Sequence, residues 1–456
     1  MTSTSGLVCS YSDAAAAGTG GLTWAQQFMH EVIRATGAQV GNFDLMVTHE
    51  VSGALSIGAA VDLVRRLVVR HPVLRTSISH DADGLPTQRV HDAGRLGISV
   101  RHSETPLPGE LRHAVPATTL ESTFSVLFVV QGDEVVRVAM RISHLVVDAH
   151  AAQMLLGAFA ELAAGRSAAA GVDEPDPASP LDLARFEASD EGRRAQRRSL
   201  EHAAAVLETA PPTMWPSRRV PQPVRFWLGD LRSADLLVSL DRMPEGRRVT
   251  RAGALIGALA AVTAFHAGTD AALLFLISGN RFDPHWTSYP GLLSQEAILR
   301  VPIAQTVGET MRAATKLSMQ ALRHARYAPS EMDKVRQAAA DRRGVTFDGL
   351  GTAVVLNLLS AEAASVAANA ADAADAPGAR STSTTFQWRE TTNDENLGLF
   401  VDAYQTPESF VLGGRVDTAL LSPDDLEQVL RAVEWTVVAA ASREVPIAEL
   451  HAYLAA

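Results

Sequence analysis

A segment rich in proline, alanine and acidic residues interrupts the sequence between Gly165 and Pro180 and constrains the fold more than any other feature. Its composition, GRSAAAGVDEPDPASP, is typical of a linker between folded parts. The chain has 456 residues, about three times the usual length of one domain, which favours two or more domains. We therefore expect an N-terminal part of residues 1–175 and a C-terminal part of residues 176–456.

The pattern of apolar residues predicts both helices and strands. Apolar residues recur at helical spacing from Leu55 to Arg70, and the following His71-Pro72 should end that helix. Glu134–Ile142 alternates like a half-buried strand, and an apolar helical face follows over Ala151–Ala164. Later strands are expected over Ala272–Ile277, Thr352–Leu358, Gly398–Ala403 and Ser409–Leu412, and a closing helix over Ser422–Ala441. Because strands and helices do not alternate regularly, two mixed α/β halves fit better than one doubly wound sheet.

Composition excludes several classes of protein. Hydrophobic residues make up 47% of the chain and charged residues 20%, as in soluble globular proteins with a large core. The longest strongly apolar run, Ala271–Ser278, is far shorter than the roughly 20 residues of a membrane helix. Met1–Gly21 has no basic residue before an apolar stretch, so we expect a frayed tail and not a signal peptide. A cytoplasmic protein without a membrane partner follows from these features.

Charge and cysteine content exclude further kinds of site. The net charge of -11 argues against a nucleic-acid partner, which requires a basic surface. The single cysteine, Cys9, allows no internal disulfide and no cysteine-built metal site. His144 and His150 have no third candidate ligand nearby in the sequence, so we expect no metal. No nucleotide- or flavin-binding motif is present either, and no such cofactor is implied.

The segment Ser143–His150 joins the predicted strand to the predicted helix, a usual place for reactive groups on a rigid frame. The imidazole of His144 could accept a proton from an attacking amine or alcohol near neutral pH. Asp148, four residues further on, is better placed to brace the loop by binding an arginine. Taken alone, such a pair is more often a buried histidine and a helix-capping aspartate than an active site.

Several motifs resemble those of condensation domains of nonribosomal peptide synthetases and their carrier-dependent acyltransferase relatives. The stretch around His144 resembles the His-His-x-x-x-Asp-Gly motif, and Arg70–Thr76 (RHPVLRT) is close to the Arg-His-x-x-Leu-Arg-Thr motif. Further similar segments, in the order of that family, are Leu22–Gln27, Pro180–Pro216, Ser278–Phe282, Gly291–Ser294 and Val355–Leu358. The resemblance therefore spans nearly the whole chain.

The resemblance implies a mixed α/β (α+β) fold of two chloramphenicol-acetyltransferase-like lobes that form a V with a central tunnel. A donor acyl group and an acceptor, each on the phosphopantetheine arm of a carrier protein, would enter from opposite faces. His144 matches the catalytic histidine, and Asp148 matches a structural aspartate whose expected partner is Arg75 or Arg281. Candidates for the tunnel lining are Trp24, Ala149, His150 and Asn357.

Two positions depart from the family motif. Ser143 replaces the first histidine, and a serine there can still form a hydrogen bond. Ala149 replaces the glycine, and its Cβ enters space where glycine allows close approach and unusual torsions. The tunnel is then narrower, the acceptor smaller, or the domain no longer catalytic.

The expected activity is that of a free-standing condensation enzyme in natural-product (antibiotic) biosynthesis. It would transfer an acyl or aminoacyl group to an amine or hydroxyl, giving an amide or an ester. The sequence has no carrier attachment site and no room for an adenylation domain, so we expect a monomer that acts on carrier proteins in trans. Two alternatives stay open: a non-catalytic module that recruits a carrier-bound intermediate, and an acyltransferase that uses acyl-CoA or a free small acceptor.

Overall fold

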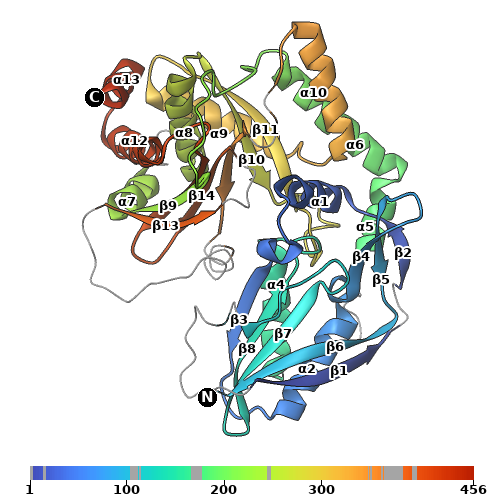
Figure 1. The fold of residues 1–456 in the computed structure, drawn as a ribbon. Helices are drawn as coiled ribbons and strands as arrows, with labels where there is room; N and C mark the ends of the chain where they lie inside the picture. Colours follow the sequence, from blue (N-terminus) through green and yellow to red (C-terminus); the bar gives the residue numbers. More distant parts are fainter. Residues whose placement is uncertain are drawn as a thin grey trace.

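The computed structural model describes residues 4–13, 17–102, 111, 114–165, 177–243, 248–347, 349, 352–360, 363, 384–392 and 398–456. Their strands form three sheets, and most helices lie against the two larger ones (Figure 1). The predicted mixed α/β fold is confirmed.

The N-terminal lobe is built on a five-stranded sheet. Its strands, in spatial order, are β1 (Thr4–Ser12), β6 (Ala93–His102), β7 (Phe124–Gln131), β8 (Glu134–Ile142) and β3 (Leu45–Glu50). A smaller sheet beside it has the order β2 (Gly18–Gly21), β5 (Pro86–Val90) and β4 (Thr76–His80). The strand predicted over Glu134–Ile142 is confirmed as β8.

Two helices cover one face of the five-stranded sheet. They are α2 (Ile57–Arg70) and α4 (Ala149–Ala163), whose apolar faces pack on side chains of all five strands. The predicted end of α2 at His71 is confirmed. Helix α4 begins two residues before its predicted start, because the side chain of Asp148 accepts the amide hydrogen of Ala151 and caps the helix. A third helix, α1 (Trp24–Thr36), is capped by Thr23 and Gln26.

The expectation of a frayed N-terminus is wrong. Residues Thr4–Ser12 form β1, which pairs along its whole length with β6. The side chains of Leu7, Cys9 and Tyr11 belong to the apolar core under the sheet, and Cys9 is buried. This two-residue alternation was present in the sequence, but the polar residues between obscured it.

The C-terminal lobe is built on a seven-stranded sheet. Its strands, in spatial order, are β11 (Gln295–Pro302), β10 (Ala271–Ser278), β12 (Val354–Leu358), β14 (Leu399–Gln405), β15 (Phe410–Asp417), β9 (Phe226–Ser233) and β13 (Thr385–Thr392). The four strands predicted in this part are confirmed as β10, β12, β14 and β15, within a few residues at their ends.

Helices of the C-terminal lobe pack against this sheet and against one another (Figure 1). They are α6 (Asp190–Leu207), α7 (Ala234–Arg242), α8 (Arg251–Ala267), α9 (Val307–Leu322), α10 (Pro329–Arg343), α12 (Pro423–Ser442) and α13 (Ile447–Ala455). The predicted closing helix is α12, but it is not the last, since Pro446 starts α13 and Leu450 and Leu454 bury it against the core. No helix among the described residues is both long and apolar enough to span a membrane.

Helix α5 (Pro180–Glu187) follows the predicted linker, yet it packs against β2 and β5 of the N-terminal lobe. Gln88 of β5 donates a hydrogen bond to the carbonyl of Pro180 at 3.3 Å. The predicted domain boundary at residue 175 and most of the predicted linker lie outside the described residues. The low-complexity stretch Ala361–Thr385 also lies largely outside them.

Candidate active site

The candidate site lies in the turn that leads from β8 into α4. Ser143 is fully buried at the end of β8, and its amide donates to the carbonyl of Thr123 at 2.9 Å. Its carbonyl oxygen accepts hydrogen bonds from the backbone amides of Val146 and Val147. Its hydroxyl accepts a hydrogen bond from the backbone amide of Leu145 at 3.3 Å. Ser143 therefore holds the turn through its backbone amide and carbonyl and through its hydroxyl.

His144 is partly exposed in this turn. Its Nδ1 lies 2.7 Å from the carbonyl oxygen of Val147. A carbonyl oxygen only accepts hydrogen bonds, so Nδ1 carries the proton and the neutral ring keeps a lone pair on Nε2. The local backbone thus orients the imidazole and selects the tautomer in which Nε2 can act as a base.

The carboxylate of Asp148 is buried and receives hydrogen bonds from both parts of the chain. Oδ1 accepts the amide hydrogen of Ala151 at 2.9 Å. Oδ2 accepts from Nη1 of Arg281 at 2.9 Å and from the amides of Leu293 at 3.0 Å and Ser294 at 3.2 Å. Burial by itself raises the pKa of Asp148, but the charge of Arg281 and these hydrogen bonds outweigh it and hold the pKa below its usual value. Asp148 is therefore an anion whose hydrogen bonds fix the turn.

Arg281 is presented by a loop with an unusual backbone. Asn280 adopts a left-handed conformation with φ of 52°, which asparagine tolerates better than most residues. Its side-chain amide donates to the carbonyls of Leu293 and Ala325, both at 2.9 Å. Arg281 also donates to the carbonyls of Gly279, Tyr289 and Gly291, so one guanidinium ties its own loop to Asp148.

Of the two arginines suggested as partners of Asp148, the structure selects Arg281 and not Arg75. Arg75 donates to the carboxylate of Asp13 at 2.6 Å and to the carbonyls of Asp13 and His91. It therefore joins the first strand to the three-stranded sheet and does not support the turn directly. The expected role of Arg75 beside Asp148 is wrong, because its side chain is already held on this other side of the lobe.

Backbone and apolar contacts reinforce the junction between the lobes. The amide of Leu292 donates to the carbonyl of Val146 at 2.8 Å. Leu292 and Leu145 share one buried cluster with side chains of α1, among them Met29 and Ile33. The turn that carries His144 is thus clamped by groups more than 140 residues away along the chain.

The four tunnel candidates lie in different surroundings. Trp24 is buried at the start of α1, and its amide donates to Glu187 at 2.8 Å. Ala149 is the first residue of α4 and is not among the described residues with positive φ, so it needs no glycine-like torsion. His150 is exposed. The side-chain amide of Asn357 donates a hydrogen bond to Oδ1 of Asp402 at 2.8 Å. The central tunnel itself stays a prediction.

Sequence reasoning missed several groups that build the site. The carbonyl of Val147 orients His144, and the amides of Leu293 and Ser294 bind Asp148. Backbone groups leave little signal in a single sequence, since any side chain can stand there. The motif-like segment Gly291–Ser294 was the available signal, but its place in the fold was not deducible from it.

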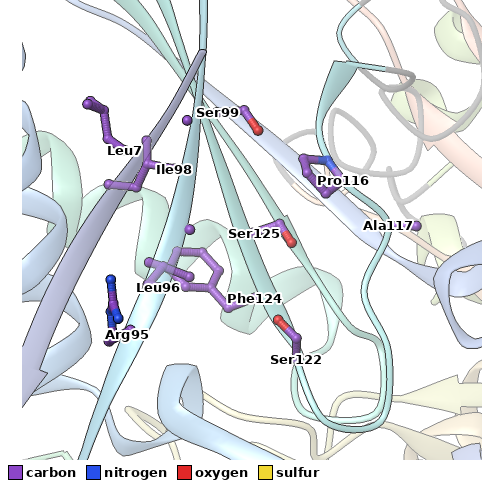
Figure 2. Close-up of a pocket in the computed structure, with 12 residues that line it drawn as sticks. Leu7, Arg95, Leu96, Ile98, Ser99, Pro116, Ala117, Ser122, Phe124 and Ser125 are labelled. Carbon is purple, nitrogen blue, oxygen red and sulfur yellow. The ribbon is translucent and has the colours of Figure 1, made fainter. Parts of the chain in front are cut away.

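Two cavities, of about 290 and 230 Å³, lie where β6 and β7 diverge. The two strands pair only from Ile98 and Val126 onward, so the start of β6 has β1 as its only strand neighbour in the described sheet. Figure 2 shows the larger cavity between Leu96 and Ile98 on one side and Ser122 and Ser125 on the other. His144 lines neither cavity.

In the described part of the chain, no three His, Cys, Asp or Glu side chains are grouped to bind a metal ion.

No protein-family model and no curated protein matches this sequence. Solved structures do match it over nearly its whole length. The condensation domain of the enacyloxin polyketide synthase has a TM-score of 0.70 at 16% identity, over 92% of this chain and 82% of that chain. SgcC5 of Streptomyces globisporus has a TM-score of 0.69 at 14% identity, over 94% and 100%. The PapA2 acyl transferase has a TM-score of 0.67 at 13% identity, over 96% and 97%.

These likenesses define the fold. The chain has the chloramphenicol-acetyltransferase-like fold of condensation domains and related acyltransferases, as the motifs suggested. His144 lies between a sheet strand and a helix N-terminus, in a turn locked by an ion pair between the two lobes.

Proposed function

We propose that this protein transfers an acyl or aminoacyl group from a carrier-protein thioester to an amine or hydroxyl acceptor, with His144 as the catalytic residue. The observation that carries the proposal is the orientation of His144. Its Nδ1 is held by Val147 at 2.7 Å, which leaves Nε2 as the basic atom. The fold, shared with condensation domains and acyltransferases, supports the same reaction class.

The proposed reaction is a substitution at the thioester carbonyl. The nitrogen or oxygen of the acceptor attacks the carbonyl carbon, a C–N or C–O bond forms, and the C–S bond breaks. Nε2 of His144 receives the proton of the acceptor and passes it to the departing thiolate, so the imidazole is regenerated. Asp148 and Arg281 keep the turn in place throughout. The proposal requires no cofactor besides the phosphopantetheine arms of partner carrier proteins, and it treats the protein as a monomer.

A related function uses a free small acceptor in place of a second carrier protein. The SgcC5 structure is described as a complex with a naphthyl-substituted ethanediol, which is a free alcohol. This observation favours testing alcohols in solution beside carrier-bound amines. Transfer to free acceptors alone would select this second function.

Mass spectrometry of intact, acyl-loaded carrier proteins tests the proposal. Wild type should unload the carrier onto an amine or alcohol acceptor, and His144→Ala should reduce that rate by about 100-fold or more, the usual size of a general-base contribution. His102→Ala is the matched control, because His102 is an exposed residue at the end of β6, outside the candidate site. If His144→Ala turns over like wild type, the assignment of His144 is wrong. If wild type binds the loaded carrier but never unloads it, the recruitment function replaces catalysis.

A further inference from the structure

Helix α6 carries positive charges that are not paired within the protein. Arg194 and Arg198 lie one turn apart on this helix, so they share one face, and both are exposed. In the part of the chain that the structure describes, neither forms an ion pair. The acidic residues within one turn of them, Glu191 and Glu201, are exposed and bind neither arginine. The charges of Arg194 and Arg198 are therefore available to another molecule.

A second segment of positive charge meets α6 at the end of α9. Residues 310–330 include four arginine or lysine residues and no acidic one, in a chain with 51 acidic and 40 basic residues. Arg323, which caps the end of α9, is exposed and forms no ion pair with the other described residues. The ring of the next residue, His324, stacks on His202 of α6 with 5.0 Å between the ring centroids. This contact places the end of α9 against α6.

The two stacked histidines reflect the positive potential at this junction. His202 follows Arg198 by one turn of α6, and His324 is next to Arg323, so the arginines flank the rings. Burial, and then the charges of Arg198 and Arg323, lower the pKa of His324. Burial and the neighbouring His324 lower the pKa of His202. Both rings are therefore neutral near pH 7, and the positive charge at the junction resides on the arginines.

An exposed apolar side chain lies beside these charges. Met319 is 55% exposed and precedes Arg323 by one turn of α9. Lys316, a further turn back, is also exposed, and its spacing keeps it on the same side of the helix. Methionine and arginine are both enriched where proteins bind one another. We define the basic surface as Arg194, Arg198, Lys316, Met319 and Arg323.

The basic surface adjoins the loop that supports the candidate active site. Two residues after Arg323, the carbonyl of Ala325 accepts a hydrogen bond from the side-chain amide of Asn280 at 2.9 Å. The residue after Asn280 is Arg281, which binds Asp148 at 2.9 Å and so fixes the candidate catalytic turn. A molecule bound to the basic surface is therefore seated next to the segment that presents Arg281.

Building on the proposed acyl transfer, we propose that the basic surface binds an acidic face of a carrier protein that delivers a substrate. The net charge of the chain is -11, so the protein as a whole repels an acidic partner and attracts it where positive charges are unpaired. Met319 adds an apolar contact between Lys316 and Arg323. The place of the surface beside the loop of Arg281 favours a carrier protein over other acidic partners, because a carrier must bring its thioester to His144.

Transfer of one acyl group from two different supports tests this docking surface. The group is presented on a carrier protein and on free pantetheine, which keeps the thioester but lacks the protein; acceptors are compared in the same way. The double variant Arg194→Glu, Arg198→Glu, and separately Arg323→Glu, should lower kcat/KM for a carrier-bound substrate by about 10-fold or more, because electrostatic steering changes association rates by at least that factor. The loss should be in KM. Both variants should use pantetheine-bound substrates like wild type.

Two further measurements examine the charge on each side of the contact. Raising the ionic strength should reduce kcat/KM of wild type for the carrier more than that of the variants, since salt screens exposed charges. A carrier whose acidic side chains beside the phosphopantetheine are changed to amides should show the same loss with wild type as the unchanged carrier shows with Arg323→Glu. The two changes together should lose less than the product of the two single losses.

Arg242→Glu provides the matched control, because Arg242 is an exposed arginine at the end of α7. Helix α7 packs against β15, whereas α6 packs against β11 at the far edge of the C-terminal sheet. The control should match wild type on both supports, and melting temperatures should show that all variants fold.

A KM for the carrier equal to that of wild type in both variants, for donors and for acceptors, would overturn the inference. An equal loss with pantetheine-bound substrate would also overturn it, since the arginines would then act on the reaction and not on docking. A loss with acyl-CoA alone would assign the surface to nucleotide phosphates instead. If wild type transfers no substrate, the proposed function fails. Calorimetric titration with the loaded carrier then decides on the surface: tighter binding by wild type than by both variants supports it, and equal affinities or no binding would overturn it.

Discussion

Replacing Arg281 by methionine should destabilise the protein by about 3–5 kcal/mol, because the substitution leaves the carboxylate of Asp148 buried without its counter-ion. The two side chains are 10% and 6% exposed and meet at 2.9 Å. Three backbone amides still donate to Asp148 in this variant, which favours the lower end of the range. Asp148→Ala should be more harmful, since it also removes the cap of α4, worth about 1 kcal/mol.

A double-mutant cycle isolates the contribution of the pair. The Asp148→Ala, Arg281→Met double variant should lose less stability than the two single variants together, with an interaction energy of about 1–3 kcal/mol. Stability is measured by chemical denaturation followed by circular dichroism, and each transition is fitted separately because two lobes can unfold in steps. Acyl transfer by Arg281→Met should fall as well, since Asp148 no longer holds the turn of His144.

The exposed pair between Arg65 and Asp62 on α2 is the matched control. It has the same chemistry at 2.7 Å, but its side chains are 46% and 52% exposed. Water screens such a pair, and its interaction energy should stay below about 0.5 kcal/mol. If the two cycles give equal interaction energies, burial does not strengthen the Asp148–Arg281 pair and our reasoning is refuted.

Three further predictions concern stability. Burial raises the pKa of Glu187 to about 8, despite its contacts with Trp24 and Arg326. The protonated side chain of Glu187 therefore contributes fully to the free energy of unfolding below its unfolded pKa near 4.3, and this contribution is lost as the pH rises to about 8. Glu187→Gln should flatten the dependence of the free energy of unfolding on pH over this range, as measured by chemical denaturation. Burial lowers the pKa of His71 to about 4, so the folded protein holds this imidazole neutral. The free energy of unfolding should therefore fall as the pH drops from about 6.5 to 4, because the unfolded chain binds a proton there first. His71→Gln should remove this loss in chemical denaturation at the same pH values. Gly257→Ala should lower the melting temperature because its Cβ would lie 2.7 Å from the backbone of Met311 in α9, whereas Gly157→Ala, with open space around it, should raise it slightly.

Local patterns allowed the regular elements around the site to be predicted. The alternation over Glu134–Ile142 matches β8, and the helical spacing that ends at His71 matches α2. These signals succeed because a strand or helix buries one face, and that face has a short period in the sequence. The start of α4 was misplaced by two residues, since a capping aspartate acts on the helix from outside the apolar pattern.

Elements at the chain ends were harder to predict. Thr4–Ser12 is mostly small and polar, but pairing with β6 satisfies its backbone and buries Cys9. Helix α13 spans Ile447–Ala455, too few residues for a clear period, and its contacts with α12 and α8 stabilise it. In both cases tertiary contacts supply the stability that local propensity lacks.

The sequence by itself determined the motif around His144, the capping position of Asp148 and the mixed α/β class, because these depend on residues within a few positions of one another. Only the tertiary structure decided between Arg75 and Arg281 as the partner of Asp148, and only it brought Leu293, Ser294 and Val146 to one turn. It also aligned Asn357, Asp402 and Asp230 across neighbouring strands of the C-terminal sheet. The physical reason is distance along the chain: Arg281 follows Asp148 by 133 residues, and no local pattern encodes which distant segments pack together.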